Sequence, residues 1–469
     1  MVYEPVKGFR DRMPREAAVV NYVCKTAERE FQNLGFLPIR TPHIEAIETL
    51  VSEETRDFGT SGEVFSFQDR GERNLGLRYD QTKGLIRAVA RGLNTGEITL
   101  PVRLSQIGSV FRQGPVGASR QRGFIQADGD IFGVKEPYAE AEIIAAAYRA
   151  LHTLEIDTEI RLNDIRLFQA LFYYAAVEPE KQQKAITTMD KLPNTGERGV
   201  RGELVHKVGL TEYATDLIMG LLAAKDVEAL RAYARDTVRL DRIRKTALER
   251  LPASNRKAAE GMRLGFPVDD IFSKLNDLQA MLRTYGVKAK IAPSLARGLD
   301  YYTGAIFEFF PPGGDKAIAG GGRYDTVMRL FGKREVIPAT GLSLGVERIV
   351  DLLIARGVEI PPVTQAYLIP VMQDGGEEEK KRFYLRAIEI AEQLRKAGIA
   401  TEVDFSGASV KSASRTASKR GVPYALYLGP EELEQGTISM KILSSHEQQK
   451  GLSMDVLIER LKHAKPATP

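Results

Sequence analysis

The sequence contains a single cysteine, Cys24, among its 469 residues. One cysteine cannot form an intrachain disulfide or a multi-cysteine zinc site, and it fits a reducing compartment. No apolar run is long enough to span a bilayer. The first residues, MVYEPVKGFRDRMP, lack the apolar core of a signal peptide. These absences predict a cytoplasmic protein with no membrane partner.

Common motifs of nucleotide and metal chemistry are missing as well. The chain has no GxxxxGK[ST] phosphate loop, no GxGxxG that opens a helix, and no HExxH motif. Its five histidines are scattered, and their spacing indicates no catalytic triad. Metal ligands therefore stay unknown from the sequence. If the chain binds a nucleotide, side chains must hold the phosphates.

Length and pattern predict more than one domain, because 469 residues are too many for one compact core. Strand-like segments occur before and after an almost wholly helical block, which favours an insertion into one α+β domain. The strand-like segments are 63–68, 75–79, 100–112, 123–132, 288–291 and 304–310.

A linker at 355–365 separates this part from a region where strand-like and helical segments alternate. That alternation predicts a small α/β domain. We place an α+β domain with an antiparallel sheet at 1–165 and 256–355, the helical insertion at 166–255, and the C-terminal domain at 364–469.

The segment VFRQGPVGASRQRGFIQADGDIF, residues 110–132, predicts a long hairpin with a polar face on its second strand. That face carries Arg120, Arg122, Phe124, Gln126, Asp128 and Asp130. Guanidinium groups bind phosphates, a phenyl ring stacks on a base, and carboxylates accept hydrogen bonds from amines. The face predicts a ligand with phosphates at one end and basic groups at the other. A salt-bridged hairpin is the alternative interpretation.

Two further segments place polar residues in apolar surroundings. In LRYDQT, Asp80 and Thr82 share one face at strand spacing, which suits an ammonium group. In ARGLDYYTGAIFEF, Arg297 precedes Tyr301 and Tyr302, of which one is expected to enter a pocket. A surface turn with core tyrosines is the alternative.

A fourth region joins AGGGRYDTVM to GLSLGVERIV. Its three glycines predict a close-packed turn. Arg348 falls at a predicted helix start, where cations are disfavoured, so an anionic partner is indicated. An ion pair with Glu347 or another acidic residue is the alternative.

These segments, in this order, resemble the class II aminoacyl-tRNA synthetases, and among them the histidyl-tRNA synthetase family. GFLPIRTPHIE resembles motif 1, with Pro42 at the dimer interface, and VFRQ…RGFIQADGDIFG and GLSLGVERI resemble motifs 2 and 3. RGLDYYTGAIFE and AGGGRYD resemble two histidine-specific signatures. The resemblance covers nearly the whole chain. It implies a class II catalytic fold with a helical insertion and a C-terminal class IIa anticodon-binding domain.

The resemblance also implies residue roles. The α-ammonium of histidine is held by Asp80, Thr82 and Gln126. The imidazole is read by Asp130 and Tyr302, and Tyr301 lines the same pocket. ATP phosphates are held by Arg112 and Arg120, and the adenine lies between Phe124 and Arg348. Arg297 takes the place of a catalytic metal at the α-phosphate, so the implied catalytic residues are Arg112 and Arg297.

The implied activity is histidine–tRNA ligation by a homodimer. Histidine and ATP, with Mg²⁺, form histidyl-adenylate, and the histidyl group then passes to the 3′ end of tRNA(His). The main alternative is a non-catalytic paralogue that acts as a regulatory subunit of histidine biosynthesis. Such a paralogue typically erodes the signatures and lacks the C-terminal domain, both of which this chain keeps. Asp80, Asp130 and RGLDYY argue against a synthetase for another amino acid.

One position departs from the family. Gly114 stands two positions after Arg112, where an acidic residue is usual. In the loop that follows, Val116, Gly117 and Ala118 offer only backbone groups to adenine and the tRNA acceptor end. The use of an extra 5′ guanosine, the other tRNA identity elements and the anticodon-contacting residues therefore do not follow from the sequence.

Overall fold

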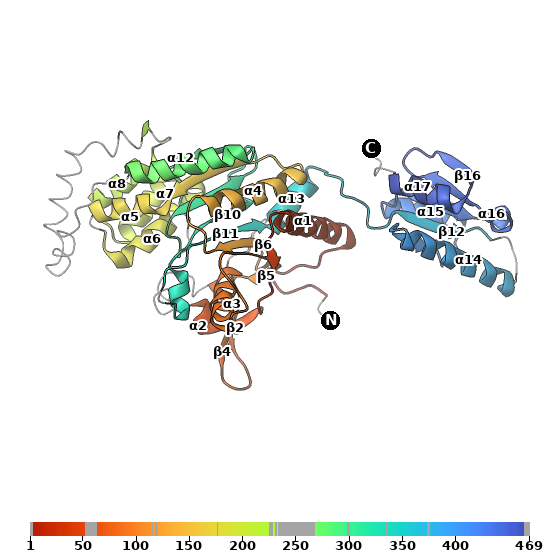
Figure 1. The fold of residues 1–469 in the computed structure, drawn as a ribbon, viewed down its shortest axis with the longest axis horizontal. Helices are drawn as coiled ribbons and strands as arrows, with labels where there is room; N and C mark the ends of the chain where they lie inside the picture. The colour runs from red at the N-terminus through yellow and green to blue at the C-terminus, as the bar shows by residue number, and fades with distance from the viewer. Residues whose placement is uncertain are drawn as a thin grey trace. The chain divides into compact units, whose positions relative to one another are not determined.

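The computed structural model describes residues 3–51, 63–114, 116–117, 121–175, 177–224, 228–229, 232, 268–297, 301–333, 335–372 and 376–463. The chain divides into two compact units, Met1–Ala355 and Arg356–Pro469 (Figure 1). Within the described ranges, no helix is long and apolar enough to cross a membrane.

The first unit is built on an eight-stranded sheet with the order β1-β5-β6-β11-β10-β9-β7-β8. The neighbours are antiparallel except for the parallel end pairs β1–β5 and β7–β8. The strands are β1 Leu37–Pro38, β5 Val102–Phe111, β6 Gly123–Phe132, β7 Glu159–Asp164, β8 Ala289–Ile291, β9 Ala305–Phe310, β10 Ala319–Arg323 and β11 Ala339–Gly345. The predicted antiparallel sheet and the β5–β6 hairpin are confirmed.

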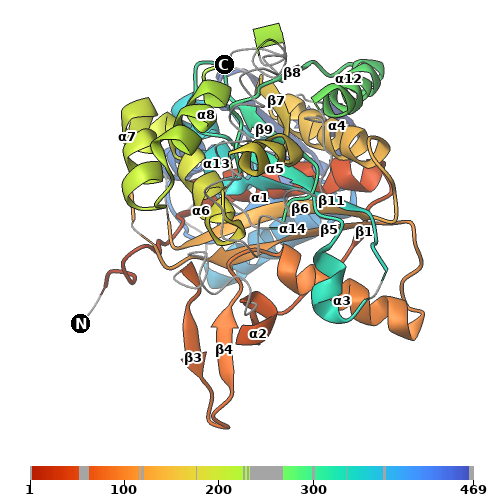
Figure 2. The same ribbon diagram turned by 90° about the vertical axis from the view of Figure 1, so that its left-hand side faces the viewer.

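Helices cover one face of this sheet (Figures 1 and 2). They are α1 Pro14–Asn33, α4 Tyr138–Thr153, α12 Val268–Thr284 and, beside α1, α13 Val346–Ala355. In α1 the buried Val20, Val23, Ala27 and Phe31 recur at helical spacing. A Cβ at Gly129 of β6 would lie 2.7 Å from the Phe31 ring, so this face of β6 is packed against α1. The opposite face of β6 is left for the polar side chains.

Smaller elements surround the sheet. A three-stranded sheet has the order β2-β4-β3, and its β3–β4 hairpin projects from the unit in Figure 2. These elements are β2 Ile44–Ala46, α2 Ile47–Leu50, β3 Ser66–Gln68, β4 Asn74–Leu77, α3 Thr82–Thr95 and the 3₁₀ helix η3 Val327–Phe331. The described residues between β7 and α12 form the helices α5 Ile165–Tyr174, α6 Pro179–Met189, α7 Leu192–His206 and α8 Glu212–Leu222. The limits 166–255 for the insertion stay a prediction, because much of 225–267 lies outside the described residues.

The second unit contains a five-stranded sheet with the order β13-β12-β14-β15-β16. Strand β12 pairs in parallel with β13 and β14, which confirms the predicted α/β pattern, and β15 and β16 form an antiparallel hairpin. The elements are β12 Ala366–Pro370, α14 Glu377–Lys396, β13 Thr401–Val403, α15 Val410–Lys419, β14 Tyr424–Leu428, α16 Pro430–Gln435, β15 Ile438–Ile442, β16 Gln448–Leu452 and α17 Met454–His463.

Candidate active site

Glycines on β10 and β11 leave space for larger side chains above the sheet face that the helices do not cover. Gly341 of β11 lies opposite Asp130 of β6 in the strand register. A Cβ at Gly341 would stand 2.0 Å from Oδ1 of Asp130, and a Cβ at Gly320 of β10 would stand 2.5 Å from Nη1 of Arg297. A Cβ at either position would force the neighbouring side chain to move, so the glycines leave the space that Asp130 and Arg297 occupy.

The acidic end of the site consists of three buried carboxylates, Asp80, Asp128 and Asp130. Burial raises the pKa of Asp128 to about 7. Burial, and then the neighbouring charge of Asp128, raise the pKa of Asp130 well above its usual range. The hydroxyl of Tyr324 donates a hydrogen bond to Oδ1 of Asp130. A ligand that brings N–H donors or positive charge would relieve this crowding of acids.

Gln126 lies on the same face of β6, and its Oε1 is buried without a hydrogen-bond partner among the described residues. A buried amide oxygen without a partner is costly, so it indicates an N–H donor supplied by a ligand.

Three tyrosines stand around Asp130. The ring centroids of Tyr301 and Tyr302 are 5.1 Å apart, and those of Tyr301 and Tyr324 are 5.7 Å apart. Gly322 makes room for the second of them, since a Cβ there would lie 2.8 Å from Cδ1 of Tyr302. Burial raises the pKa of all three hydroxyl groups, so they remain neutral hydrogen-bonding groups at neutral pH.

The strand interpretation of LRYDQT is wrong beyond Leu77. Strand β4 ends at Leu77, and Thr82 is the first residue of α3. Oδ1 of Asp80 accepts a hydrogen bond from the backbone N–H of Lys83, as an acidic residue near a helix N-terminus commonly does. A hydrogen bond with Thr82 counteracts part of the rise in the pKa of Tyr301, so the hydroxyl of Thr82 still borders the pocket.

At the other end of the face, Arg112 follows directly after β5. Its Nε donates to the carbonyl of Tyr79 at 3.0 Å, and its guanidinium lies 5.2 Å from the ring centroid of Phe124. Arg122 donates from Nε to the carbonyl of Gly114 at 3.1 Å. The predicted phosphate ligand Arg120 lies outside the described residues.

Arg297 lies beside the tyrosines, over Gly320 of β10. It forms an ion pair with Glu308 of β9, and its guanidinium carbon is 5.9 Å from the ring centroid of Tyr302. Nε of Arg297 is buried and makes no hydrogen bond within the described part of the chain. A guanidinium with spare donors beside a polar pocket is suited to an anionic group of a ligand.

The helix start predicted at Glu347 and Arg348 is confirmed by α13. The two oxygens of Glu347 have other partners: Oε1 accepts from Nη2 of Arg12 at 2.9 Å, and Oε2 accepts from the backbone N–H of Ile125 at 2.8 Å. Whether Arg348 pairs with an acid or with an anionic ligand stays a prediction. Nη1 of Arg348 donates to the carbonyl of Ala317. Glu347 therefore joins the start of α13 to the strand that carries Phe124.

Several residues of the site were not predicted. Tyr324 lies in AGGGRYD, from which only a close-packed glycine turn was predicted. Arg78 lies in LRYDQT, from which only the roles of Asp80 and Thr82 were predicted. Arg78 is buried and donates to the carbonyls of Ser109 and Thr41, and its guanidinium interacts electrostatically with Asp128. No group of three or more His, Cys, Asp or Glu side chains among the described residues could hold a metal ion.

Comparisons with known proteins agree over nearly the whole chain. A family model described as histidyl-tRNA synthetase matches residues 8–193 and 194–349, and one described as an anticodon binding domain matches residues 365–464. The histidine–tRNA ligase 1 of Bacillus cereus is 30% identical over 456 residues, which are 96% of this chain and 95% of the relative. The histidine–tRNA ligase of Aeropyrum pernix is 33% identical over 445 residues, 93% of this chain and 92% of the relative.

Solved structures give the same result. The histidyl-tRNA synthetase of Nostoc sp. PCC 7120 superposes with a TM-score of 0.75 at 25% identity and covers 98% of this chain and 99% of its own. A protein of Bacillus halodurans described as an ATP phosphoribosyltransferase regulatory subunit/histidyl-tRNA synthetase has a TM-score of 0.66 at 20% identity, over 92% of this chain and 97% of its own. At that identity the likeness shows the fold alone.

Proposed function

The chain belongs to the histidyl-tRNA synthetase family, and we propose that it activates histidine with ATP and transfers the histidyl group to the 3′ end of tRNA(His). One observation carries the proposal. A cluster of buried carboxylates and tyrosines adjoins Arg297, and glycines of β10 and β11 leave room for these side chains. An acidic pocket next to a guanidinium matches a basic amino acid whose own carboxylate must meet a phosphate.

Residue roles are proposed on the same basis. The α-ammonium of histidine is held by Asp80, Thr82 and Gln126, and its imidazole by Asp130 and Tyr302, with Tyr301 as a wall. The partnerless oxygen of Gln126 and the raised pKa of Asp130 support a ligand rich in N–H donors. ATP phosphates meet Arg112 and Arg120, and adenine lies between Phe124 and Arg348. The adenine position requires the Arg112 guanidinium to leave the Phe124 ring when ATP binds.

The first half-reaction needs no protein nucleophile. The carboxylate of histidine attacks the α-phosphorus in line, the bond to the bridging oxygen breaks, and pyrophosphate leaves. Arg297 and Arg112 stabilise the charge that develops on the phosphoryl oxygens, and the pocket holds the carboxylate at attacking distance. In the second half-reaction the terminal ribose hydroxyl of tRNA attacks the mixed anhydride, and AMP leaves.

Three finer features belong to the proposal. Mg²⁺ enters with ATP as its phosphate complex. The protein works in the cytoplasm, where it meets tRNA and ATP. It is a homodimer through the segment around Pro42, and this is supported by two exposed apolar side chains near it, Leu37 at 59% and Ile44 at 47% exposure. Sedimentation velocity of the purified protein tests the dimer, and a Pro42→Asp variant should sediment as a monomer.

Histidine-dependent exchange of pyrophosphate into ATP, measured without tRNA, tests the activation step. We expect exchange with histidine and none with the other nineteen amino acids, followed by charging of tRNA(His) when tRNA is added. Folded protein that binds histidine but gives no exchange would contradict the proposal and favour the regulatory paralogue.

A further inference from the structure

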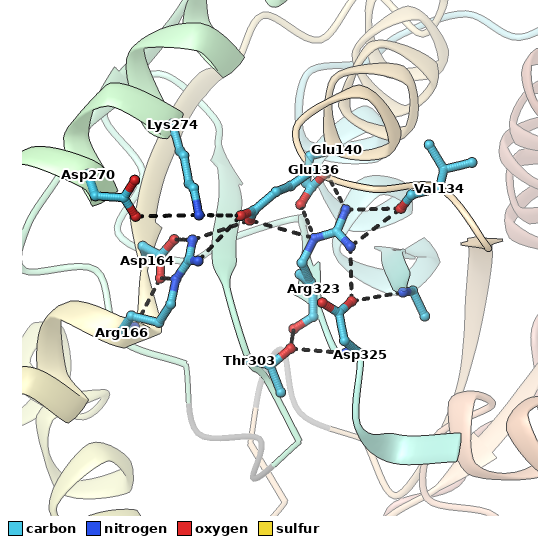
Figure 3. Close-up of polar contacts among 11 residues, drawn as sticks. Val134, Glu136, Glu140, Asp164, Arg166, Asp270, Lys274, Thr303, Arg323 and Asp325 are labelled. Carbon is cyan, nitrogen blue, oxygen red and sulfur yellow. Dashed lines mark hydrogen bonds and ion pairs between the residues drawn. The ribbon is translucent and has the colours of Figure 1, made fainter. Parts of the chain in front are cut away.

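A buried ion network lies on the helix-covered face of the sheet, behind the proposed histidine pocket (Figure 3). At its centre is Arg323, the last residue of β10. Its Nε and Nη2 donate to the two carboxylate oxygens of Glu140 on α4 at 2.5 and 2.8 Å. The Arg323 and Glu140 side chains are 3% and 0% exposed. Charges this deeply buried need matched partners, and the two-point contact holds the end of β10 in one position on α4.

Asp325 extends this contact to two other backbone segments. Its Oδ1 accepts from Nη1 of Arg323 and from the backbone N–H of Ala339, each at 2.9 Å. Its own N–H donates to Oγ1 of Thr303 at 2.9 Å. The N–H of Thr303 in turn donates to the carbonyl of Arg323 at 2.8 Å. The two histidine-specific signatures are thereby joined to each other by hydrogen bonds that do not include the pocket side chains.

The residues next to these contacts carry the pocket. Tyr324 lies between Arg323 and Asp325, and its side chain lies on the opposite side of the strand, where its hydroxyl donates to Asp130. Tyr302 directly precedes Thr303 in the chain. A shift of Thr303 relative to Asp325 would therefore change the separation of Tyr302 and Tyr324.

We propose that Thr303, Arg323, Asp325 and Glu140 form a positioning unit that sets the separation of Tyr302 and Tyr324 around the imidazole ring and so determines the selectivity for histidine. None of the four touches the substrate. The inference rests on the proposed function, because it takes the ring between the tyrosines to be that of histidine. A recognition site must hold its groups within a few tenths of an ångström, and two tyrosines from separate segments need a shared support.

The network also contains an outer part, whose residues are not next to any of the pocket tyrosines in the chain. Glu136 accepts from Nζ of Lys274 on α12 at 2.8 Å and from Nη2 of Arg166 on α5 at 3.2 Å (Figure 3). On α4 itself, Glu142 pairs with Arg103 of β5 at 2.6 Å. Glu140 and Glu142 thus each pair with an arginine of the sheet from the same helix, the Glu142 pair being the more exposed one, and only Glu140 belongs to the positioning unit.

The decisive variants are Thr303→Val, which removes the hydroxyl at nearly constant shape, and Thr303→Ser, which keeps it. Histidine Kd is measured by calorimetry, and the KM values for histidine and ATP by pyrophosphate exchange. Thr303→Val should raise the histidine Kd about tenfold, as the loss of one buried hydrogen bond does, and leave the ATP KM within about twofold. Thr303→Ser should remain near the wild type.

A second pair of variants uses the two glutamates. Glu140→Gln should raise the histidine KM more than Thr303→Val does, whereas Glu142→Gln should leave it unchanged. Selectivity is read from the ratio of exchange with histidine to exchange with triazolylalanine, whose ring nitrogens differ. If the positioning unit sets selectivity, that ratio should fall in Thr303→Val. A general loss of stability would instead lower both rates alike and leave the ratio unchanged.

Two outcomes overturn the inference alone: a folded Thr303→Val with a histidine Kd within about twofold of wild type, or an equal loss for histidine and ATP. Wild-type protein that binds histidine without exchange would defeat the proposed function, while the Kd comparison would still decide the positioning unit. Wild-type protein that binds no histidine overturns both.

Discussion

Replacing Asp128 by Asn should make the protein more stable than the wild type at alkaline pH. Asp128 is 4% exposed on the strand that also carries Asp130, and burial raises its pKa to about 7 from a usual value of 3.8. The ionised form is therefore disfavoured in the folded protein. Asn keeps the size and one oxygen of the side chain but has no charge to bury.

The sign and size follow from proton linkage. A carboxyl group whose pKa is raised in the folded state binds its proton more tightly there than in the unfolded chain. Its contribution to folding is therefore fully present below pH 3.8 and is lost as the pH rises to about 7. Between pH 5 and 8.5 the wild type crosses the upper two pH units of this window, which at 1.36 kcal/mol per unit amounts to ~3 kcal/mol. The charge of Asp128 also raises the pKa of Asp130, so both groups shift stability in the same direction.

The measurement is urea unfolding of ligand-free wild type and Asp128→Asn at pH 5, 6, 7 and 8.5. The signal followed is that of the first unit, Met1–Ala355, which contains Asp128. We expect the difference in free energy of unfolding, variant minus wild type, to increase by ~3 kcal/mol from pH 5 to pH 8.5. Asp69→Asn is the control. Asp69 is partly exposed, and its hydrogen bond with Arg73 lowers its pKa, so it titrates below the range and should produce no such trend. A constant difference between Asp128→Asn and wild type from pH 5 to 8.5 would refute the reasoning.

Three other predictions, made on four variants, test the remaining parts of the site. Arg297→Ala should lower kcat for pyrophosphate exchange by about 100-fold or more with little change in histidine Kd, because a charge that acts on the transition state is removed; equal losses in kcat and in histidine affinity would contradict this role. Asp130→Asn should raise the histidine KM by about tenfold at unchanged ATP KM, since one charge-assisted hydrogen bond is lost; an unchanged histidine KM would place the imidazole elsewhere. Glu347→Gln should raise the ATP KM by about fivefold and leave the histidine KM unchanged, and Arg12→Met should have the same effect. Either change weakens the contacts that hold the start of α13, with Arg348, to the strand that carries Phe124. Exchange kinetics with each substrate varied in turn measure the two KM values, and an unchanged ATP KM in both variants would contradict this role.

Sequence reasoning succeeded where one local period dominates. The even face of β6 was predicted because five polar or aromatic residues alternate with small apolar ones over a single strand. It failed at LRYDQT, where period two continues in the letters but the chain turns into α3 at Thr82. A six-residue window cannot distinguish a strand end from a helix start when the capping carboxylate itself looks like part of the alternation.

The partners across the sheet could not be predicted in the same way. The Tyr324–Asp130 hydrogen bond joins residues 194 positions apart, and the Glu347–Ile125 contact joins residues 222 apart. Such pairs depend on strand order, in which β11 inserts between β6 and β10 although both it and β10 follow the helical block. No spacing in the sequence encodes that order. Resemblance to the family located the segments, and the structure was needed to show which side chains they bring together.

The stretch GGGRYD shows how completely the two faces of one strand can be assigned different tasks. Gly320 and Gly322 face the pocket and leave space for Arg297 and Tyr302. Gly321 faces the other way, where a Cβ would lie 2.0 Å from the carbonyl oxygen of Gly341. A side chain at Gly320 would meet the end of a flexible arginine, but one at Gly321 would meet backbone and force the strands apart. Gly320 therefore leaves room for the end of a flexible side chain, Gly321 for the backbone of β11, and Gly322 both for the Tyr302 ring and for the carbonyl oxygen of Ala305, which would lie 2.7 Å from a Cβ there.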